Sequence, residues 1–414
     1  MKRDACVIVE TPRTGAGESA AVRMLECGVQ PVLLSQMAAD LPAGLLDRYA
    51  ELGVPVVKCA TFDLDEVVRA CGALADEYGL RGIASFYEYT TEIAARAALV
   101  FGVPGPDPDA VARCRDKPEM RRVLRDRAPE LTVGYVVGDD PVLVAKQAAE
   151  LGFPVVVKPV HLTGSAFVKL CATEEEVRDQ ARLILAIGEY VGLAVRPLVQ
   201  VEEYVRGTEF SVEVVGGRAV AVTRKLIGPE PYFVELGHLV PAPEPEPVHR
   251  QAADAALTAL RALGLGWGAA HVELRLSGDH AKIIEVNPRL AGDRIPELVR
   301  LAIGVDLTTE LVRAHLGLPP GEPGTGTGGA AIAFAVAPPS GRLRSIQGVD
   351  DVRARPDVAE VRLYKGVGVT YESNGSNRDR VASVIATAGN SAVAAERAND
   401  AVRALSFDWR EVPT

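Results

Sequence analysis

The stretch from Ala269 to Asp293 limits the possible folds of this chain more than any other part of it. It predicts two short strands, His271–Leu276 and Lys282–Val286, joined by the turn Ser277-Gly278-Asp279. Two strand-like runs separated by a tight turn are typical of an antiparallel hairpin. We therefore expect this stretch to lie within a β-sheet.

Polar residues on this hairpin predict a metal site. Glu273 lies on the first strand and Glu285 on the second, and Asn287 follows two residues later. Residues i and i+2 of a strand face the same side, and hairpin pairing can bring Glu273 beside the other two. Two carboxylates and an amide oxygen suit Mg²⁺, which also keeps waters and phosphate oxygens as ligands. Arg289, further along that face, could hold a phosphoryl group or a substrate carboxylate. The alternative is an ordinary hairpin with solvated acids.

Composition and charge argue against several classes of protein. The chain has 414 residues and a net charge of −10, which is unfavourable for a nucleic-acid or anionic-membrane surface. No apolar run reaches membrane-spanning length, and the first residues are strand-like, without the apolar region of a signal peptide. The six cysteines are scattered, with no C-x-x-C pair, which indicates reduced thiols in a cytoplasmic protein.

The N-terminal part alternates between strand-like and helical runs. The expected strands are Cys6–Val9, Pro31–Leu34, Val54–Val57 and Gly82–Ser85, and the expected helices are Ala20–Cys27, Leu45–Leu52, Asp65–Tyr78 and Glu92–Phe101. This alternation predicts a small parallel sheet covered on both faces. Gly15 and Gly17 precede the first helix, where the backbone is suited to an anion. A nicotinamide-binding interpretation of this turn is weak, because a lone G-x-G is common and no well-placed acidic residue follows.

Two lysines are candidates for binding phosphate. Lys117 lies in a charged helical segment after a proline-rich boundary. Lys158 ends the buried strand Pro154–Val157, before the turn Thr163-Gly164-Ser165 and a second expected strand, Ala166–Leu170. An ammonium group at the tip of an apolar strand can neutralise phosphate while turn amides donate hydrogen bonds. The alternative for Lys158 is an edge lysine that reaches solvent.

Residues 202–209 carry a pattern suited to a nucleoside. Glu202 and Glu203 end one expected strand, and Glu209 begins the next. The backbone from Glu203 through Tyr204 to Val205 can read the edge of an adenine, and the Glu209 carboxylate can take two ribose hydroxyls. A plain hairpin with solvated acids is the alternative.

Taken in order, these segments resemble an ATP-grasp enzyme over nearly the whole chain. In this superfamily one lysine precedes the first subdomain and another ends a strand beside the phosphate loop, which matches Lys117 and Lys158. A hinge of Glu-x-Tyr-hydrophobic, with a ribose-binding Glu seven residues after its first Glu, matches Glu202 through Val205 and Glu209. The metal pattern, a Glu followed twelve residues later by Glu-x-Asn-x-Arg, matches Glu273, Glu285, Asn287 and Arg289.

Three further segments resemble the L-amino acid ligase branch: S-F-Y-E-Y-T-T-E-I-A-A-R-A-A, G-V-P-G-P and F-V-E-L-G-H-L-V-P-A. Biotin carboxylase-like members continue after the arginine with Gln-Val-Glu-His, whereas this chain has Leu290-Ala291-Gly292-Asp293. D-alanine ligase-like members have Asn-x-x-Pro-Gly after the second metal Glu, which is also absent here. Both differences favour the L-amino acid ligase branch.

The resemblance implies an α/β fold of three parts. These are a Rossmann-like pre-ATP-grasp domain at 1–105, a central ATP-grasp domain at 106–320 with a mobile small subdomain at about 130–205, and a C-terminal α/β lid at 325–414. The implied activity is an ATP-dependent carboxylate–amine ligase that forms an amide through an acyl phosphate. ATP and Mg²⁺ are the implied cofactors, with Mn²⁺ as a substitute for Mg²⁺.

The resemblance also implies roles for single residues. Arg289 would stabilise the acyl phosphate and then the oxyanion. His238 is a candidate for contacting substrate or accepting the amine proton, although a lone loop histidine is more often structural. The expected partners are a small carboxylate and a small amine, with no nucleic acid and no membrane, and a homodimer is left open. The rival functions are an ATP-grasp enzyme of purine or carboxyphosphate chemistry and a non-catalytic ATP-binding protein.

Overall fold

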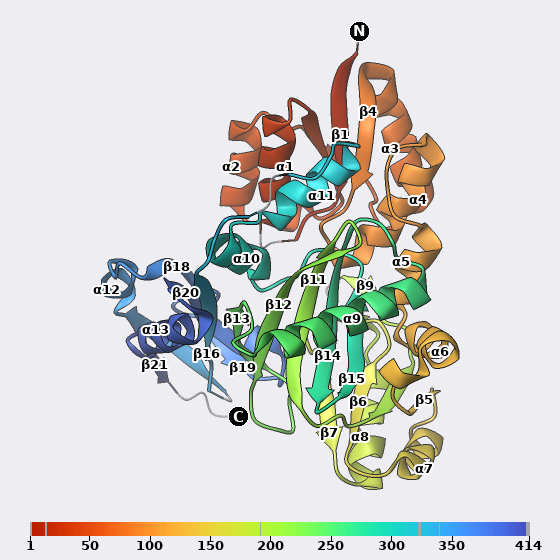
Figure 1. Cartoon of the computed structure of the whole chain (residues 1–414), viewed down its shortest axis with the longest axis vertical. Helices are drawn as coiled ribbons and strands as arrows, with labels where there is room; N and C mark the ends of the chain where they lie inside the picture. Colours follow the sequence, from red (N-terminus) through yellow and green to blue (C-terminus); the bar gives the residue numbers. More distant parts are fainter. Residues whose placement is uncertain (1, 13–14, 191, 322–323, 339, 411–414) are drawn as a thin grey trace.

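The computed structural model describes residues 2–12, 15–190, 192–321, 324–338 and 340–410. Arg13 and Thr14 of the glycine turn, and Glu322 and Pro323 of the linker before the C-terminal part, lie outside these ranges. The chain folds into helices and sheets arranged along one long axis, which confirms the predicted α/β class (Figure 1). No helix within the described ranges is long and apolar enough to cross a membrane.

The N-terminal domain is a parallel sheet of strand order β3-β2-β1-β4. Its strands are β1 (Arg3–Val9), β2 (Gln30–Ser35), β3 (Val56–Lys58) and β4 (Tyr78–Ala84), and its helices are α1 (Ala16–Glu26), α2 (Ala43–Glu51), α3 (Leu64–Glu77) and α4 (Thr91–Phe101). The central strand β1 is buried from Ala5 to Val9, as expected when helices cover both faces of a parallel sheet. The four predicted strands and four predicted helices are confirmed, with small shifts at their ends.

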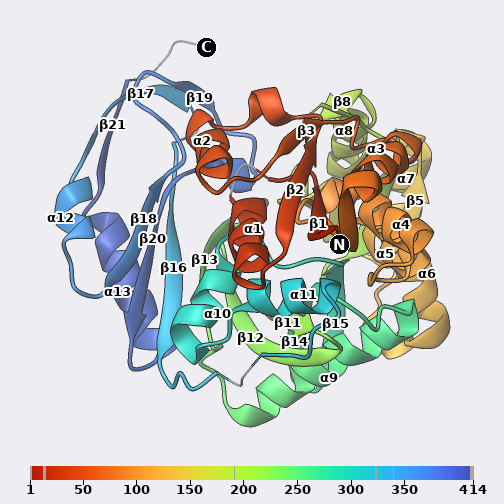
Figure 2. The same ribbon diagram turned by 90° about the horizontal axis from the view of Figure 1, so that it is seen from above.

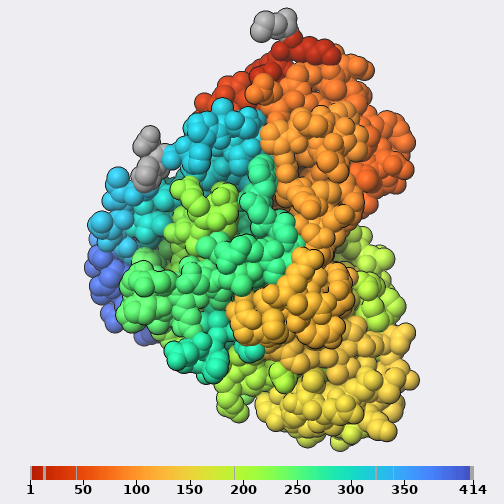
Figure 3. Space-filling model, turned by 45° about the vertical axis from the view of Figure 1, so that its right-hand side comes forward, coloured from red at the N-terminus to blue at the C-terminus, as the bar shows by residue number. Residues whose placement is uncertain are grey.

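Two helices, α5 (Pro108–Arg115) and α6 (Lys117–Arg127), lead from this domain to a small subdomain at the other end of the molecule. Figure 3 shows the subdomain in yellow at the bottom, with the orange helices along the side above it. Its antiparallel sheet has the order β5-β10-β6-β7. The strands are β5 (Tyr135–Gly138), β6 (Val155–Pro159), β7 (Lys169–Cys171) and β10 (Val199–Glu203), and they pack on α7 (Pro141–Leu151) and α8 (Glu174–Leu185).

The predicted strand Ala166–Leu170 is wrong in extent. Only Lys169–Cys171 pairs with β6, and residues 163–168 form a loop instead. Within that loop Ser165 and Phe167 adopt φ angles of 57° and 59°, a left-handed conformation that no strand allows. A short hairpin, β8 (Glu189–Tyr190) and β9 (Leu193–Ala194), lies between α8 and β10.

The core of the molecule is an eight-stranded sheet of order β15-β14-β11-β12-β13-β16-β20-β18. Its first five strands are β11 (Thr208–Val215), β12 (Arg218–Ile227), β13 (Glu235–Val240), β14 (Ala269–Ser277) and β15 (His280–Asn287). The helix α9 (Glu246–Leu263) crosses one face of these strands, and the helices α10 (Ile295–Ile303) and α11 (Leu307–His315) follow β15 (Figure 1). Val212, Val272 and Leu274 point into the apolar core beneath α9. The residues between them in sequence therefore point to the opposite face, which is polar.

Three strands of the predicted C-terminal lid extend this same sheet, because β16 pairs with β13. They are β16 (Gly329–Val336), β18 (Val358–Leu363) and β20 (Arg380–Ala388), with α12 (Val349–Arg353) and α13 (Ser391–Arg403) beside them. A separate three-stranded sheet joins β17 (Ser340–Gln347), β19 (Thr370–Glu372) and β21 (Ser406–Arg410). Figure 2 shows this blue C-terminal part on the opposite side of the molecule from α5, α6 and α7.

Candidate active site

The β14–β15 hairpin brings the predicted metal ligands onto one face. Ser277 pairs with His280 across the turn, and the register shifts by one residue between Glu273 and Leu274. Glu273 therefore lies directly opposite Glu285, and Asn287 lies opposite His271. Without this bulge Glu285 would pair with a residue of the buried face, since a slip of one residue turns a side chain to the other side of the sheet.

Lys225 of β12 connects Glu273 with two further carboxylates. Its Nζ lies 2.7 Å from Glu273, 3.3 Å from Glu235 and 3.4 Å from Glu209. Burial opposes the charged ammonium, but these carboxylates outweigh it and raise the pKa of Lys225 well above its ordinary value. The lysine thus supplies positive charge at the centre of the polar face.

His271 lies between two carboxylates on the same face. Its Nδ1 is 2.9 Å from Glu213, and its Nε2 is 3.1 Å from Glu273. Burial opposes protonation of the ring, but the two carboxylates raise the pKa of His271 to about 10. Lys225 and His271 in turn hold the pKa of Glu273 well below its usual range, against the effect of burial. The charged ring therefore fixes the orientation of Glu273.

The two predicted phosphate-binding lysines approach this hairpin from separate elements. Lys117, at the start of α6, has its Nζ 2.8 Å from Glu285 and donates a hydrogen bond of 2.9 Å to the Leu162 carbonyl. Lys158, at the end of β6, has its Nζ 2.7 Å from Glu202. Both lysines are buried, so Lys158 is not the solvent-seeking edge lysine of the alternative interpretation.

Arg121 explains how Glu202 is held. Its guanidinium donates to both Glu202 oxygens, at 2.7 and 3.0 Å, and to the carbonyls of Ile283 and Ile284 on β15. Arg121 and Lys158 lower the pKa of Glu202 to about 2 in spite of its burial. For Lys158 burial dominates, helped by Arg121 and Lys117, and its pKa is lowered. The Glu202 carboxylate thus orients Lys158.

The loop of residues 163–168, called the phosphate loop below, adjoins Lys117 and Lys158. Its Gly164, Ser165 and Phe167 all have positive φ, and left-handed non-glycine residues concentrate at functional sites. Two contacts hold the loop. The Tyr89 hydroxyl of the N-terminal domain lies 3.4 Å from the Thr163 hydroxyl, and Gln180 of α8 donates a hydrogen bond to the Phe167 carbonyl. Its contacts with the C-terminal part are described below.

The predicted adenine and ribose contacts lie together at the hinge after β10. The Glu203 backbone and side chain pair with Gly134, and the Tyr204 hydroxyl donates to Glu230 at 2.8 Å. Arg275 donates to the Val205 carbonyl at 2.7 Å and to Glu209 at 2.9 Å. The hinge is therefore ordered by its own polar contacts, and the nucleoside-binding roles of these residues stay predictions.

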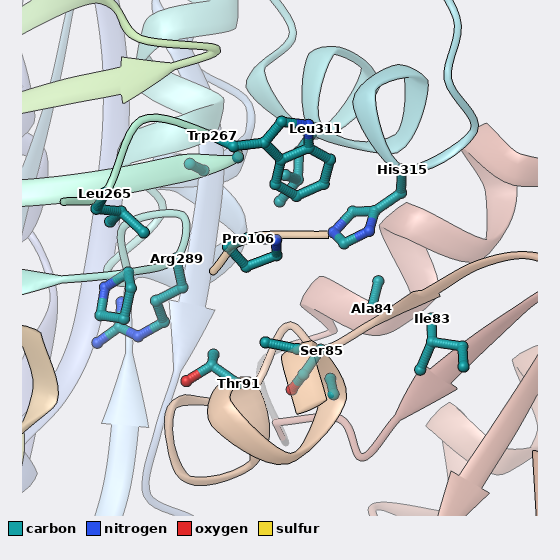
Figure 4. Close-up of a pocket in the computed structure, with 15 residues that line it drawn as sticks. Ile83, Ala84, Ser85, Thr91, Pro106, Leu265, Trp267, Arg289, Leu311 and His315 are labelled. Carbon is teal, nitrogen blue, oxygen red and sulfur yellow. The ribbon is translucent and has the colours of Figure 1, made fainter. Parts of the chain in front are cut away.

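Arg289 is paired with a residue of the N-terminal domain. Its Nε donates to Glu88, which also lies 3.6 Å from Arg115. Burial opposes the charged guanidinium, but Glu88 and the nearby hairpin acids keep the pKa of Arg289 raised. Arg289 also borders a cavity of about 30 Å³ between the two domains (Figure 4). A space of that size holds water rather than a larger molecule.

His238 is fully buried and faces two acids. Its Nε2 lies 3.1 Å from Glu235 and 3.3 Å from Asp293, whose carboxylate also pairs with Arg380 at 2.7 Å. Burial opposes protonation, but Asp293 and Glu235 outweigh it and raise the pKa of His238. Atoms of His238, Glu235 and Asp293 lie within 4.8 Å of one another, a spacing compatible with a cation. The Nε2 of His238 already contacts both acids, so this nitrogen is not free to bind a metal ion here.

The residues of the hairpin fit Mg²⁺ and nucleotide phosphates. Glu273, Glu285 and Asn287 offer only oxygen ligands, the donor set that Mg²⁺ prefers. The ammonium groups of Lys225 and Lys117 lie beside Glu273 and Glu285, at the positions where a metal ion would be attracted most strongly. Displaced by a metal, the two ammonium groups would be available to phosphate oxygens.

Comparisons with known proteins agree with this geometry. A family model described as ATP-grasp domain matches residues 151–297, and one described as L-amino acid ligase C-terminal domain 2 matches residues 333–410. An uncharacterized protein of Sinorhizobium fredii, y4rH, is 33% identical over 412 residues, which cover 99% of this chain and 84% of that protein.

The chain belongs to the ATP-grasp superfamily. Within the superfamily it is a carboxylate–amine ligase homologue that resembles the L-amino acid ligase branch. Carnosine synthase 1 of Gallus gallus is 27% identical over 84% of this chain, but this chain spans only 38% of that protein's length. The solved structure of an L-amino acid ligase from Bacillus licheniformis matches with a TM-score of 0.79 at 19% identity, over 99% of this chain and all of the other, and so has the same fold.

Several residues of the ATP-grasp polar face were not foreseen from the sequence. Arg121 could have been found from the sequence, because it lies four residues after Lys117 and so on the same face of α6. No sequence pattern points to Lys225, Glu88 or Arg380, since each reaches the site only through a strand register or a contact between domains.

Proposed function

We propose that this ATP-grasp protein is an ADP-forming ligase that joins the carboxylate of an amino acid, or of a related acid, to an amine. The observation that carries the proposal is the facing pair Glu273 and Glu285, with Arg289 beyond it on the same strand end. A carboxylate pair for a metal next to a buried arginine suits phosphoryl transfer to an anionic acceptor.

In the proposed reaction an oxygen of the substrate carboxylate attacks the γ-phosphorus of ATP, and ADP leaves. The nitrogen of the amine then attacks the carbonyl carbon of the acyl phosphate, and inorganic phosphate leaves. Mg²⁺ held by Glu273, Glu285 and Asn287 would neutralise charge on the transferring phosphoryl group. Mn²⁺ is proposed as a substitute.

The chain's own residues have separable tasks in this proposal. Lys117 and Lys158 hold phosphate oxygens, and the hinge residues Tyr204 and Val205 with Glu209 hold the nucleoside. Arg289 releases Glu88 to bind the acyl phosphate and then the oxyanion of the tetrahedral intermediate. The phosphate loop excludes water, which would otherwise hydrolyse the acyl phosphate.

The acids around His238 support an amino acid as the carboxylate substrate. Glu235 and Asp293 offer negative charge for an ammonium group, while Arg289 offers positive charge for a carboxylate. Asp293 and Glu235 raise the pKa of His238 in spite of its burial, and its Nε2 already contacts both acids. We therefore assign His238 a contact role beside the substrate rather than the role of the base that accepts the amine proton.

The experiment that tests the proposal is a screen for phosphate release with ATP, Mg²⁺ and pairs of amino acids, followed by mass analysis of the products. An active pair should give one ADP and one phosphate per amide. An ¹⁸O label in the substrate carboxylate should appear in the released phosphate, because that oxygen leaves with it. AMP and pyrophosphate as products would exclude an acyl-phosphate ligase. Turnover that requires bicarbonate or formate would favour the purine or carboxyphosphate alternative, and nucleotide binding without any turnover would favour a non-catalytic protein.

A further inference from the structure

The segment between β19 and β20 of the C-terminal part contacts both the phosphate loop and the small subdomain. The backbone N–H of Asn377 donates to the Gly164 carbonyl of the phosphate loop at 3.3 Å. The Asn377 side-chain oxygen accepts the backbone N–H of Glu235 at 2.9 Å. One residue therefore connects the phosphate loop with the strand that begins at Glu235 and carries His238.

The next residue reaches the phosphate loop by a second route. The Arg378 guanidinium lies 4.6 Å from the centre of the Tyr190 ring in the β8–β9 hairpin. The Tyr190 ring in turn meets the Phe167 ring edge to face, with centroids 5.7 Å apart and planes at 73°. Phe167 belongs to the phosphate loop. Arg378, Tyr190 and Phe167 therefore form a continuous row of side chains from the C-terminal part to that loop.

The segment itself is held firmly in place. The Asp379 carboxylate accepts hydrogen bonds from the Ser373 hydroxyl and from the backbone N–H of Asn374 and Gly375. Asp379 is buried, whereas Arg378 is exposed and packs on the Tyr190 ring. A segment fixed by hydrogen bonds thus presents an exposed side chain to the small subdomain.

We propose that Arg378 is a positioning residue that holds the phosphate loop closed through Tyr190 and Phe167. This inference rests on the proposed function, because it assigns the loop the task of enclosing the reacting phosphoryl group. Arg378 does not itself touch the substrates. When it releases Tyr190, the loop loses its contact with the C-terminal part at this point, and water gains access to the acyl phosphate.

The consequence is a specific kind of defect. Loss of Arg378 should leave ATP binding nearly intact but separate ATP hydrolysis from amide formation. A cation–π contact at an exposed site changes an equilibrium by about 2–5-fold. Uncoupled phosphate release, and the opening of the loop, should therefore rise by about that factor.

The experiment measures backbone hydrogen–deuterium exchange of residues 163–168, without ligand and with Mg²⁺ and ADP, beside the ratio of phosphate released to amide formed. The variants are Arg378→Gln and Tyr190→Leu, with Arg378→Lys and Tyr190→Phe as conservative changes that keep the cation or the ring. Arg403→Gln is the matched control, since it removes an exposed arginine of the same part that pairs with Asp400 within α13, a helix that packs on β16 and β20.

Faster exchange of residues 163–168 and more uncoupled hydrolysis in Arg378→Gln and Tyr190→Leu, with recovery in Tyr190→Phe and partial recovery in Arg378→Lys, would support the proposal. The double variant should be no worse than either single one, because both remove the same contact. The proposal would be overturned if residues 163–168 exchanged equally fast in Arg378→Gln and Arg403→Gln. If the unmodified protein forms no amide, the proposed function fails, yet the ligand-free exchange still decides whether Arg378 holds the loop.

Discussion

Each carboxylate on the polar face of the central sheet has a cation beside it. Glu209 has Arg275, Glu213 has His271, Glu273 and Glu235 share Lys225, and Glu285 has Lys117. In the proposed metal site, a divalent ion would therefore compete with Lys225 for Glu273 and with Lys117 for Glu285. We expect these two carboxylates to respond to metal and nucleotide together.

The first prediction concerns Glu285. A neutral amide cannot hold a divalent cation as a carboxylate does, so Glu285→Gln should lose Mg²⁺-dependent turnover by about 100-fold or more, at least the loss seen for outer-shell partners of a metal ligand. The variant should stay folded, because its Lys117 partner still has the Leu162 carbonyl. Steady-state rates across a Mg²⁺ titration measure this, with the exposed Glu246→Gln as control. Near-normal rates in saturating Mg²⁺ would remove Glu285 from the metal site.

The second prediction is the pH dependence created by His271. Its folded pKa of about 10 lies above the unfolded value of 6.5, so the folded state binds the proton more tightly. The stability gained is complete below pH 6.5 and disappears as the pH rises toward 10. A tenfold difference in proton affinity corresponds to about 1.4 kcal/mol of unfolding free energy, so the effect should exceed about 1 kcal/mol. With a chelator present, the difference in Tm between the unmodified protein and His271→Gln should shrink from pH 6.5 to pH 9.5. A constant difference would show that the ring is not held as an imidazolium.

At the scale of elements, bulges in the β14–β15 and β11–β12 pairs decide which residues share the polar face. Ile283 and Val286 are both buried in the core, although alternation would send residues three apart to opposite faces. The bulge at Ile284 resolves this conflict, and the broken alternation was visible in the sequence. The bulge in the β11–β12 hairpin brings Lys225 toward Glu209. It could not be recognised from the sequence, because the residues around it, such as Ala219 and Ala221, are small and show no break in alternation. Motif spacing thus predicted that Glu273 and Glu285 lie together, and their role as metal ligands stays a prediction. The contacts of Lys225 with Glu273, Glu235 and Glu209 depend on a register that spacing does not fix.

The third prediction concerns the contacts by which Arg121 of α6 connects β10 with β15. Arg121 is fully buried and donates to Glu202 and to two carbonyls, so Arg121→Met would leave several buried acceptors without donors. Breaking a buried ion pair from one side costs about 3–5 kcal/mol. Arg121→Lys keeps the charge but not the planar fork, and should cost less. Thermal unfolding measures both. Equal Tm values for Arg121→Met and the unmodified protein would mean that these contacts are not a source of stability.

At the scale of the whole molecule, the N-terminal domain closes one side of the site. Glu88 reaches Arg289 across 201 residues of chain, and Tyr89 reaches the phosphate loop. Gly82 of β4 lies against the His315 carbonyl of α11, so close that a side chain there would meet it at 2.7 Å. The domain itself was predictable from its βαβ pattern, but these contacts were not, because they depend on how two separately folded parts meet. The predicted division into 1–105, 106–320 and 325–414 stays a prediction, although the sheet itself runs from the second part into the third.

The last prediction concerns the stability of this domain interface in acid. His315 lies in it, beside the Pro104 backbone and edge-on to Trp267, with ring centroids 4.9 Å apart (Figure 4). Burial lowers the pKa of His315 to about 4, and the Pro104 contact only partly offsets this. The unfolded chain therefore binds the proton more tightly. The stability that the neutral ring supplies is complete above pH 6.5 and is lost as the pH falls toward 4.

His315→Gln keeps a hydrogen-bond donor for Pro104 but does not titrate. Between pH 6.5 and pH 4.5 the Tm of the unmodified protein should therefore fall further than that of His315→Gln, by an amount on the order of 2–4 °C for each kcal/mol. Trp267 and Trp409 are the two tryptophans of the chain, so a Trp409→Phe background makes fluorescence report on the interface alone. In that background the acid transition should begin at higher pH when His315 is retained than in the His315→Gln variant. Superimposable acid transitions would mean that folding does not change the proton affinity of His315, and that the interface does not depend on its neutral form.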